Sequence, residues 1–190
     1  MRKTKPVMKY RRKRQAKTNY KKRLDLLKSS LPRIVIRISL NDVIIQGVEY
    51  APDGDKILFS AHSKQLQKLG WKAHRSNLPT AYLTGYLCGK KAKDTKGEFI
   101  LDLNKSNLSK GNKIYAALKG LLDAGLNVLH SEDIVPQPER LSGKHIEDYA
   151  KKIKDSDAYK KQFSAYLKQG FAPEEFTKHF EEIKQKIEKV

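Results

Sequence analysis

Three short stretches in the first third of the chain alternate between apolar and polar positions. Residues 33–39 (RIVIRIS) place three isoleucines on one face, and residues 43–50 and 57–61 are also rich in β-branched and aromatic residues. A period of two in such residues is typical of β-strands. Turn-forming residues at 41–42 and 52–55 separate the stretches. We therefore predict a three-stranded antiparallel meander.

Helical spacing replaces this alternation in the middle of the chain. Residues 77–93 begin with Asn-Leu-Pro, a typical helix start, and residues 111–125 carry apolar residues every three or four positions before a final glycine. Short strands are predicted at 99–103 (FILDL) and at 127–130. The order predicts an α/β fold, in which a β-α-β crossover extends the meander into a mixed sheet with helices packed on it.

The N-terminal segment has a different character. Residues 1–16 show no apolar periodicity, and we predict that they are coil in the free protein. Residues 18–31 then place Tyr20 and three leucines on one face of a predicted helix, which Thr18 or Asn19 can cap. The basic residues of this helix fall off the apolar face, where they can reach phosphate.

The C-terminal segment is predicted to be helical. After a linker marked by two prolines, amphipathic stretches predict three short helices at 142–154, 156–169 and 173–189. Such helices are marginal alone and must bury their apolar stripes on another surface. That surface can be the body, the other helices of the segment or a partner, and the nearly neutral charge favours protein or self-packing over RNA. We divide the chain into a basic arm with a short helix (1–32), a mixed α/β body (33–135) and a linker with a helical extension (136–190).

Positive charge is concentrated in the arm. The chain has 40 Lys and Arg residues against 21 Asp and Glu, a formal net charge of +19. Fifteen of the basic residues but only one acidic residue lie in residues 1–37. A chain this basic calls for a polyanionic partner, and nucleic acid is the commonest one. Tyr, Thr, Asn and Gln interrupt the cations of residues 10–24, and these side chains suit base stacking and contacts with sugars or base edges.

We predict RNA contacts from the arm, from two arginines of the first strand and from a cluster before the central helix. In that cluster Trp71 can either stack on a base or cap the hydrophobic core, and both roles stay open at this point. The predicted RNA-binding residues are Arg11, Arg12, Lys13, Arg14, Lys17, Thr18, Asn19, Tyr20, Lys21, Lys22, Arg23, Arg33, Arg37, Trp71, Lys72 and Arg75.

The sequence gives little support for a disulfide, a phosphate-binding loop or a metal site. The single cysteine, Cys88, allows neither an internal disulfide nor a cysteine metal cluster, and we expect it to be a small buried residue. Residues 85–91 (GYLCGKK) resemble a phosphate-binding loop, but the spacing is short and they lie inside a predicted helix. We instead expect Gly85 and Gly89 to let that helix pack closely on the sheet. The histidines show no metal-ligand spacing, and we expect no metal site.

Three further features bear on where the protein acts. No apolar run is long enough to span a membrane, no secretory signal is present, and the lone cysteine fits a reducing compartment. We therefore expect a cytoplasmic protein.

Two alternative functions remain open. The order of elements is also that of ribonuclease-H-like nucleases, with Asp102 as a candidate catalytic residue, but that chemistry needs several carboxylates around two metal ions. The first strand carries none, so we expect Asp102 to be structural, capping a loop or pairing with a lysine. The second alternative is a basic scaffold that binds anionic surfaces such as membranes, using the amphipathic extension.

Five segments, in order, resemble archaeal members of the large-subunit ribosomal protein 18 family, which is related to the eukaryotic ribosomal protein that carries 5S rRNA. They are residues 10–37 (YRRKRQAKTNYKKRLDLLKSSLPRIVIR), 60–72 (SAHSKQLQKLGWK), 79–92 (PTAYLTGYLCGKKA), 115–126 (YAALKGLLDAGL) and 138–149 (PERLSGKHIEDY). One departure concerns the turn after the first strand. The family tends to have Lys-Ser-Asn-Lys there, whereas this chain has Asp42 and no lysine.

This resemblance implies a structural constituent of the large ribosomal subunit. The implied partners are 5S rRNA, 23S rRNA in the central protuberance and neighbouring large-subunit proteins. The resemblance implies no enzymatic activity, no cofactor, no small-molecule substrate and no membrane contact. Its RNA-contacting element is the basic N-terminal segment, which falls here on residues 11–14 and 17–23, with the strand arginines Arg33 and Arg37.

Overall fold

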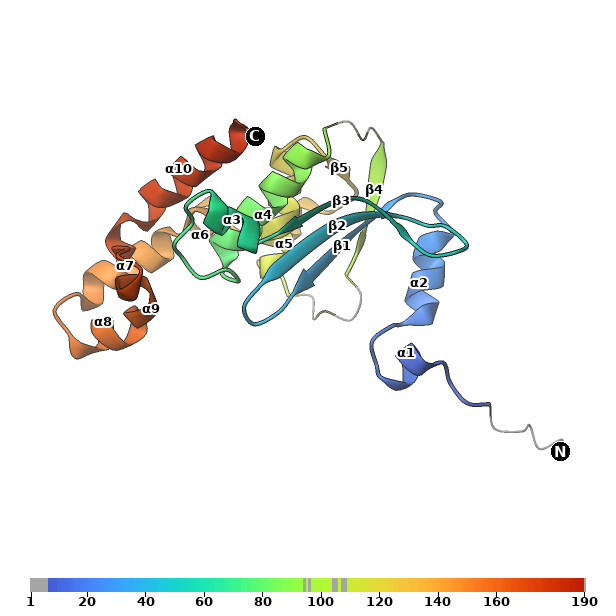
Figure 1. The fold of residues 1–190 in the computed structure, drawn as a ribbon, viewed down its shortest axis with the longest axis horizontal. Helices are drawn as coiled ribbons and strands as arrows, with labels where there is room; N and C mark the ends of the chain where they lie inside the picture. The colour runs from blue at the N-terminus through green and yellow to red at the C-terminus, as the bar shows by residue number, and fades with distance from the viewer. Residues whose placement is uncertain (1–6, 94, 96, 104–105, 107–108, 190) are drawn as a thin grey trace.

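The fold is built on a five-stranded sheet (Figure 1). The computed structural model describes residues 7–93, 95, 97–103, 106 and 109–189, so the first six residues of the predicted arm lie outside the described part. The strands are β1 (Arg33–Ile38), β2 (Val43–Glu49), β3 (Lys56–His62), β4 (Glu98–Asp102) and β5 (Asn127–Val128). Their order is β3-β2-β1-β4-β5, with β1 to β3 antiparallel and β4 parallel to β1 and β5. The predicted mixed sheet is confirmed.

Two long helices follow the predicted helical segments, α4 (Leu78–Lys91) and α5 (Lys113–Asp123). The side-chain oxygen of Asn77 caps α4 by accepting a hydrogen bond of 2.9 Å from the backbone N–H of Thr80. Pro79 fits in the first turn, where a backbone donor would have no partner in the helix. The side-chain oxygen of Asn112 begins α5 in a similar way, by accepting from the next backbone N–H.

Glycines bring α4 and α5 into backbone contact. A Cβ atom on Gly85 would overlap the carbonyl oxygen of Ala117, and one on Gly89 would collide with the side chain of Ala124. The prediction that these glycines pack on the sheet is therefore wrong, because their partner is α5. Close approach without side chains lets the two helices cover the sheet as one layer.

The helices α4 and α5 cover one face of the sheet. Ile34, Ile36 and Ile45 are at most 1% exposed on this face. The rings of Phe59 and Phe99 meet edge to face with their centroids 5.7 Å apart. Successive side chains of a strand point to opposite faces. The alternate positions of β1 and β2 therefore face away from the helices, toward the arm.

The arm contains the predicted helix, α2 (Tyr20–Leu27), and Asn19 is its cap. Residues 11–14 differ from the expected coil, because they form one helical turn, α1 (Arg11–Arg14). Another short helix, α3 (Lys64–Lys68), lies between β3 and α4. A helix of four or five residues is too short to produce a periodic apolar pattern, so neither could be predicted.

The C-terminal extension divides into more pieces than expected. Its helices are α6 (Pro138–Ser142), α7 (Lys144–Ile153), α8 (Asp157–Gln162), α9 (Ser164–Lys168) and α10 (Phe176–Glu188), with 3-10 turns at η1 (Glu132–Ile134) before them and η2 (Pro173–Glu175) before α10. Pro138, predicted to lie in a linker, begins α6. The predicted helix over 156–169 is interrupted at Phe163, whose backbone leaves the helical region. No helix among the described residues has the length and apolar character needed to cross a bilayer.

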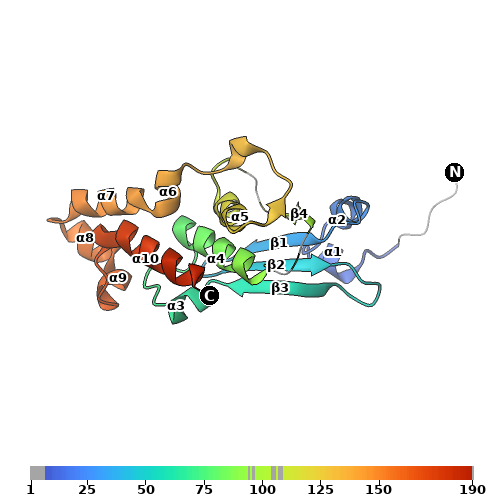
Figure 2. The same cartoon turned by 90° about the horizontal axis from the view of Figure 1, so that it is seen from above.

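The extension docks on the body through α10, which lies along α4 (Figure 2). Its apolar stripe of Phe176, Phe180, Ile183 and Ile187 is buried in the same core as the sheet and α4. The expectation that these helices pack on protein is confirmed, and the protein surface is the chain's own.

Trp71 forms the junction between body and extension. The indole is 2% exposed, stacks on the ring of His179 at 5.1 Å and meets Phe176 edge to face. Its N–H donates to the hydroxyl of Thr80 at 2.9 Å. Of its two open roles the structure selects the core, and the prediction that Trp71 contacts RNA is wrong.

The environment of Cys88 yields a first prediction. Its side chain is fully buried between α4 and β2, and burial raises the pKa of the thiol from 9.0 to about 12. Because the thiolate is the reactive form, we expect no modification by a thiol reagent in the native protein at neutral pH. Rapid reaction in denaturant would show that the thiol itself is intact. Stoichiometric labelling of the native protein would contradict this environment.

Glu147 provides a prediction about acid stability. Its carboxylate accepts from Lys151 and from Thr177 of α10, both at 2.6 Å, and these hydrogen bonds lower its pKa from 4.5 to about 2. A lowered pKa means that the contribution to stability is complete above about 4.5 and is lost as the pH falls to about 2.

We expect Glu147→Gln to lower the free energy of unfolding by about 1 kcal/mol at neutral pH, because solvent screening at this partly exposed site reduces the ~1.5 to 3 kcal/mol of a hydrogen bond to a charged group. The difference from wild type should vanish near the acid end of that window. Thermal unfolding at a series of pH values measures both. If the difference in stability is the same at every pH, ionisation of Glu147 does not contribute to the stability of the fold.

Candidate nucleic-acid interface

A groove of about 800 Å³ separates the arm from the face of the sheet that the helices leave uncovered. Nine of the sixteen predicted RNA-binding residues line it: Arg12, Lys17, Thr18, Asn19, Tyr20, Lys22, Arg23, Arg33 and Arg37. Arg11, Lys13, Arg14 and Lys21 are exposed on the same two helices, α1 and α2. Trp71, Lys72 and Arg75 lie elsewhere. The structure thus gathers most of the predicted residues around one concave surface.

The sheet contributes residues that sequence reasoning missed. Val35 of β1 and Gln46 of β2 are register partners, and both line the groove, together with Val48 and Ile57. The period of two could have found Gln46, because it places that side chain on the same face as Arg37. Gln46 supplies both a donor and an acceptor, which is what reading a base edge requires.

Local hydrogen bonds shape the arm. The Nε atom of Arg12 donates to the hydroxyl of Thr18 at 2.8 Å, and the backbone N–H of Lys17 donates to the carbonyl of Arg12 at 2.9 Å. Asn19 then caps α2 by accepting from the backbone N–H of Lys22 at 3.3 Å. These contacts fold the loop between α1 and α2 back on itself. Polar residues predicted to contact RNA therefore also hold the shape of the arm.

A chain of ion pairs attaches the arm to the sheet. Arg23 of α2 pairs with Asp55 at 2.7 Å, Asp55 pairs with Arg33 at 2.7 Å, and Arg33 pairs with Asp102 at 2.9 Å. The four residues come from α2, the turn between β2 and β3, β1 and β4. Each central member bridges two partners of opposite charge, so removing one disturbs the whole chain of contacts.

The ionisation states follow from these contacts. Burial opposes ionisation of Asp55, but hydrogen bonds from Arg23 and Arg33 outweigh it, and the pKa of the carboxyl is lowered. The hydrogen bond to Asp55 in turn raises the pKa of Arg23. Asp55 and Arg23 therefore stay charged at neutral pH.

Arg33 is 1% exposed, and the prediction that it contacts RNA is wrong. Its guanidinium is occupied by two carboxylates instead. Arg23 is likewise less available for phosphate than the sequence predicts, because it is bound to Asp55. Lys28 forms only a surface ion pair with Asp25 at 3.3 Å and stays exposed. Arg37, which shares a face with Arg33, is exposed.

Asp102 is structural, as expected, and its carboxylate forms an ion pair with Arg33 at 2.9 Å. The carboxylate neutralises Arg33 beneath the arm. Among the described residues, no group of three or more His, Cys, Asp or Glu side chains is placed to hold a metal ion.

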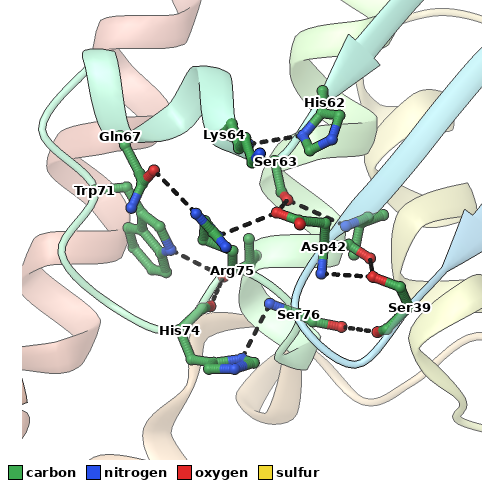
Figure 3. Close-up of polar contacts among 12 residues, drawn as sticks. Ser39, Asp42, His62, Ser63, Lys64, Gln67, Trp71, His74, Arg75 and Ser76 are labelled. Atoms are coloured by element: carbon green, nitrogen blue, oxygen red, sulfur yellow. Dashed lines mark hydrogen bonds and ion pairs between the residues drawn. The ribbon is translucent and has the colours of Figure 1, made fainter. Parts of the chain in front are cut away.

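The cluster around Arg75 joins the β1–β2 turn to the loop before α4 (Figure 3). Arg75 forms an ion pair with Asp42 at 3.1 Å and donates to Gln67 at 3.5 Å, while Ser76 donates to the carbonyl of Ser39 at 2.7 Å. The acid that departs from the family's basic turn therefore has an internal partner. Arg75 remains partly exposed, with 28% of its side-chain surface accessible. The charge of Arg75 is therefore paired within the protein, with Asp42.

Arg33 offers a direct test of the ion-pair chain. A lysine at this position carries the same charge but cannot donate in a planar fork to both Asp55 and Asp102. We expect Arg33→Lys to lower the free energy of unfolding by about 1 to 3 kcal/mol in urea titrations. The matched control is Arg37→Lys on the exposed part of the same strand, which should change stability by less than about 0.5 kcal/mol. Equal stability of the two variants would contradict the bridging role.

Comparison with known proteins supplies the family. A family model described as ribosomal large subunit proteins 60S L5 and 50S L18 matches residues 5–99, a range that contains α1, α2, β1 to β3 and α4. The large ribosomal subunit protein uL18 of Methanococcus maripaludis is 50% identical over 180 residues, which is 94% of this chain and 93% of that protein. The chain therefore belongs to the L5/L18 family of large ribosomal subunit proteins.

Proposed function

We propose that this constituent of the large ribosomal subunit binds 5S rRNA and helps to attach it to 23S rRNA in the central protuberance. The observation that carries the proposal is the groove between the basic arm and the uncovered sheet face. It combines cations for phosphates with amide and hydroxyl groups for sugars and base edges. The role is structural, so we expect no enzymatic activity and no requirement for a cofactor.

Burial and charge divide the arm residues between two tasks. Arg23 and Arg33 hold the arm on the sheet through Asp55. The exposed cations of α1 and α2, together with Arg37, are then the residues proposed to contact phosphates. Thr18, Asn19 and Gln46 line the groove at positions suited to sugars and bases. Because the arm is already attached to the sheet, less freedom is lost when RNA binds.

The second RNA and the protein partners are proposed for other surfaces. Lys72 is exposed on the loop before α4, with its backbone held by the ring of His179, and it is a candidate contact for 23S rRNA. Exposed side chains of the extension, such as Tyr149 and Leu167, are candidates for neighbouring large-subunit proteins. The extension lies at the end of the molecule remote from the arm (Figure 1), so both kinds of partner can bind together.

Deleting residues 1–23 tests the proposal. We expect the deletion to abolish tight binding of 5S rRNA while the body stays folded, because the core lies in the sheet, α4, α5 and α10. If wild type contacts about six to ten phosphates, its affinity should fall by about 10³- to 10⁵-fold between 50 and 200 mM salt. Titration onto 5S rRNA and onto an unrelated hairpin of equal length, at both salt concentrations, measures affinity and specificity.

The controls separate the remaining alternatives. Circular dichroism of the deletion variant should show the fold of wild type, so that lost binding is not lost structure. An unchanged affinity for 5S rRNA after deletion would overturn the proposal. Equal binding of both RNAs that collapses with salt would indicate a polycation without recognition. Binding to anionic liposomes that survives deletion of residues 1–23 would instead favour a membrane-surface scaffold.

A further inference from the structure

Two tyrosines from separate segments of the arm meet at its surface. Tyr10 precedes α1 and Tyr20 is the first residue of α2, yet their ring centroids lie 5.5 Å apart with the planes inclined at 51°. The hydrogen bond between Arg12 and Thr18 closes the loop that brings the two segments together. The contact is therefore part of how the arm folds on itself.

The rings are more exposed than an apolar contact within a fold requires. Tyr10 is 75% exposed and Tyr20 is 37% exposed, and α2 has no buried residue. Large aromatic side chains normally gain their stabilisation from burial, so an exposed pair indicates a surface that a ligand covers. Tyr20 also lines the groove, which places the pair at its rim.

The surroundings point to the chemistry of the ligand. Arg11, Lys13, Arg14, Lys17 and Lys21 are exposed near the pair in the chain. Aromatic rings beside cations suit a nucleotide, whose base stacks on the ring while its phosphate meets the charge. A base inside a duplex is already stacked on both sides, so the ring pair selects an unpaired base.

We propose that Tyr10 and Tyr20 form a stacking platform for an unpaired base of the RNA that the arm binds. The ligand class is a nucleotide in a loop, bulge or single-stranded end. This inference rests on the proposed function and adds the part of the RNA that the arm recognises. The cations hold phosphates wherever they lie, whereas the platform requires a base that is not paired.

The test compares substitutions that separate stacking from charge. We expect the double variant Tyr10→Ala, Tyr20→Ala to bind 5S rRNA about 5- to 150-fold more weakly, the range for loss of base stacking. The slope of log affinity against log salt should stay unchanged, because no phosphate contact is lost. Lys21→Ala is the matched control, and it should reduce that slope by about 0.7 to 0.9 if the lysine contacts one phosphate.

A second variant distinguishes stacking from a purely structural clasp. Tyr10→Leu, Tyr20→Leu keeps an apolar contact between the segments but removes both aromatic faces. The platform predicts that the leucine variant binds as weakly as the alanine variant, and that all forms bind a fully paired RNA duplex of equal length alike. Wild-type affinity of the leucine variant, or an equal loss on the duplex, would overturn it.

Failure of the stacking platform can be distinguished from failure of the proposed function. If wild type shows no preference for 5S rRNA over the unrelated hairpin, the proposed function fails. The platform is still judged by the difference between RNA with unpaired bases and duplex RNA. If the preference for 5S rRNA persists in the alanine variant at full affinity, the platform fails and the proposed function stands.

Discussion

The arrangement of the arm and the sheet depends on compensating the charge of one buried arginine. Arg33 lies within β1, where a guanidinium without partners would be strongly unfavourable. Asp55 and Asp102 provide the opposite charges. Their ion pairs with Arg33 fix the positions of the turn between β2 and β3 and of the end of β4. Asp55 then reaches Arg23 and positions α2. Without these carboxylates, the positive charges of the arm and of the sheet arginines would repel each other.

This network also explains why some sequence predictions succeeded and others did not. Alternation in residues 33–50 predicts β1 and β2 because burial of one face is a local property. The same alternation cannot separate Arg33 from Arg37, which share a face and a residue type. The difference comes from carboxylates 22 and 69 positions away in the sequence. Contacts at that separation are created by the fold, so the exposed and the buried arginine look alike before it is known.

Trp71 and the C-terminal helices show the same limit from the apolar side. The apolar stripe of α10 can be recognised in the sequence, but the surface on which it packs cannot. That surface belongs to α4, which is apolar around most of its circumference and shows no single face for a partner. Docking of α10 on α4 buries Trp71 and removes it from the predicted interface. Charge and composition predict a nucleic-acid partner. The five segments that resemble the ribosomal family in the same order predict a ribosomal protein. The groove itself required the structure, since its two walls are separate elements.

The distribution of charge has a consequence for how the protein meets its partner. The net charge of +19 is concentrated at the end that carries the arm, while the extension at the opposite end is nearly neutral (Figure 1). Such a molecule has a large electric dipole along its long axis. In the field of a polyanion it experiences a torque that turns the arm forward before contact. Orientation during approach raises the fraction of productive encounters, so an arm that binds RNA as proposed would also set the rate of association.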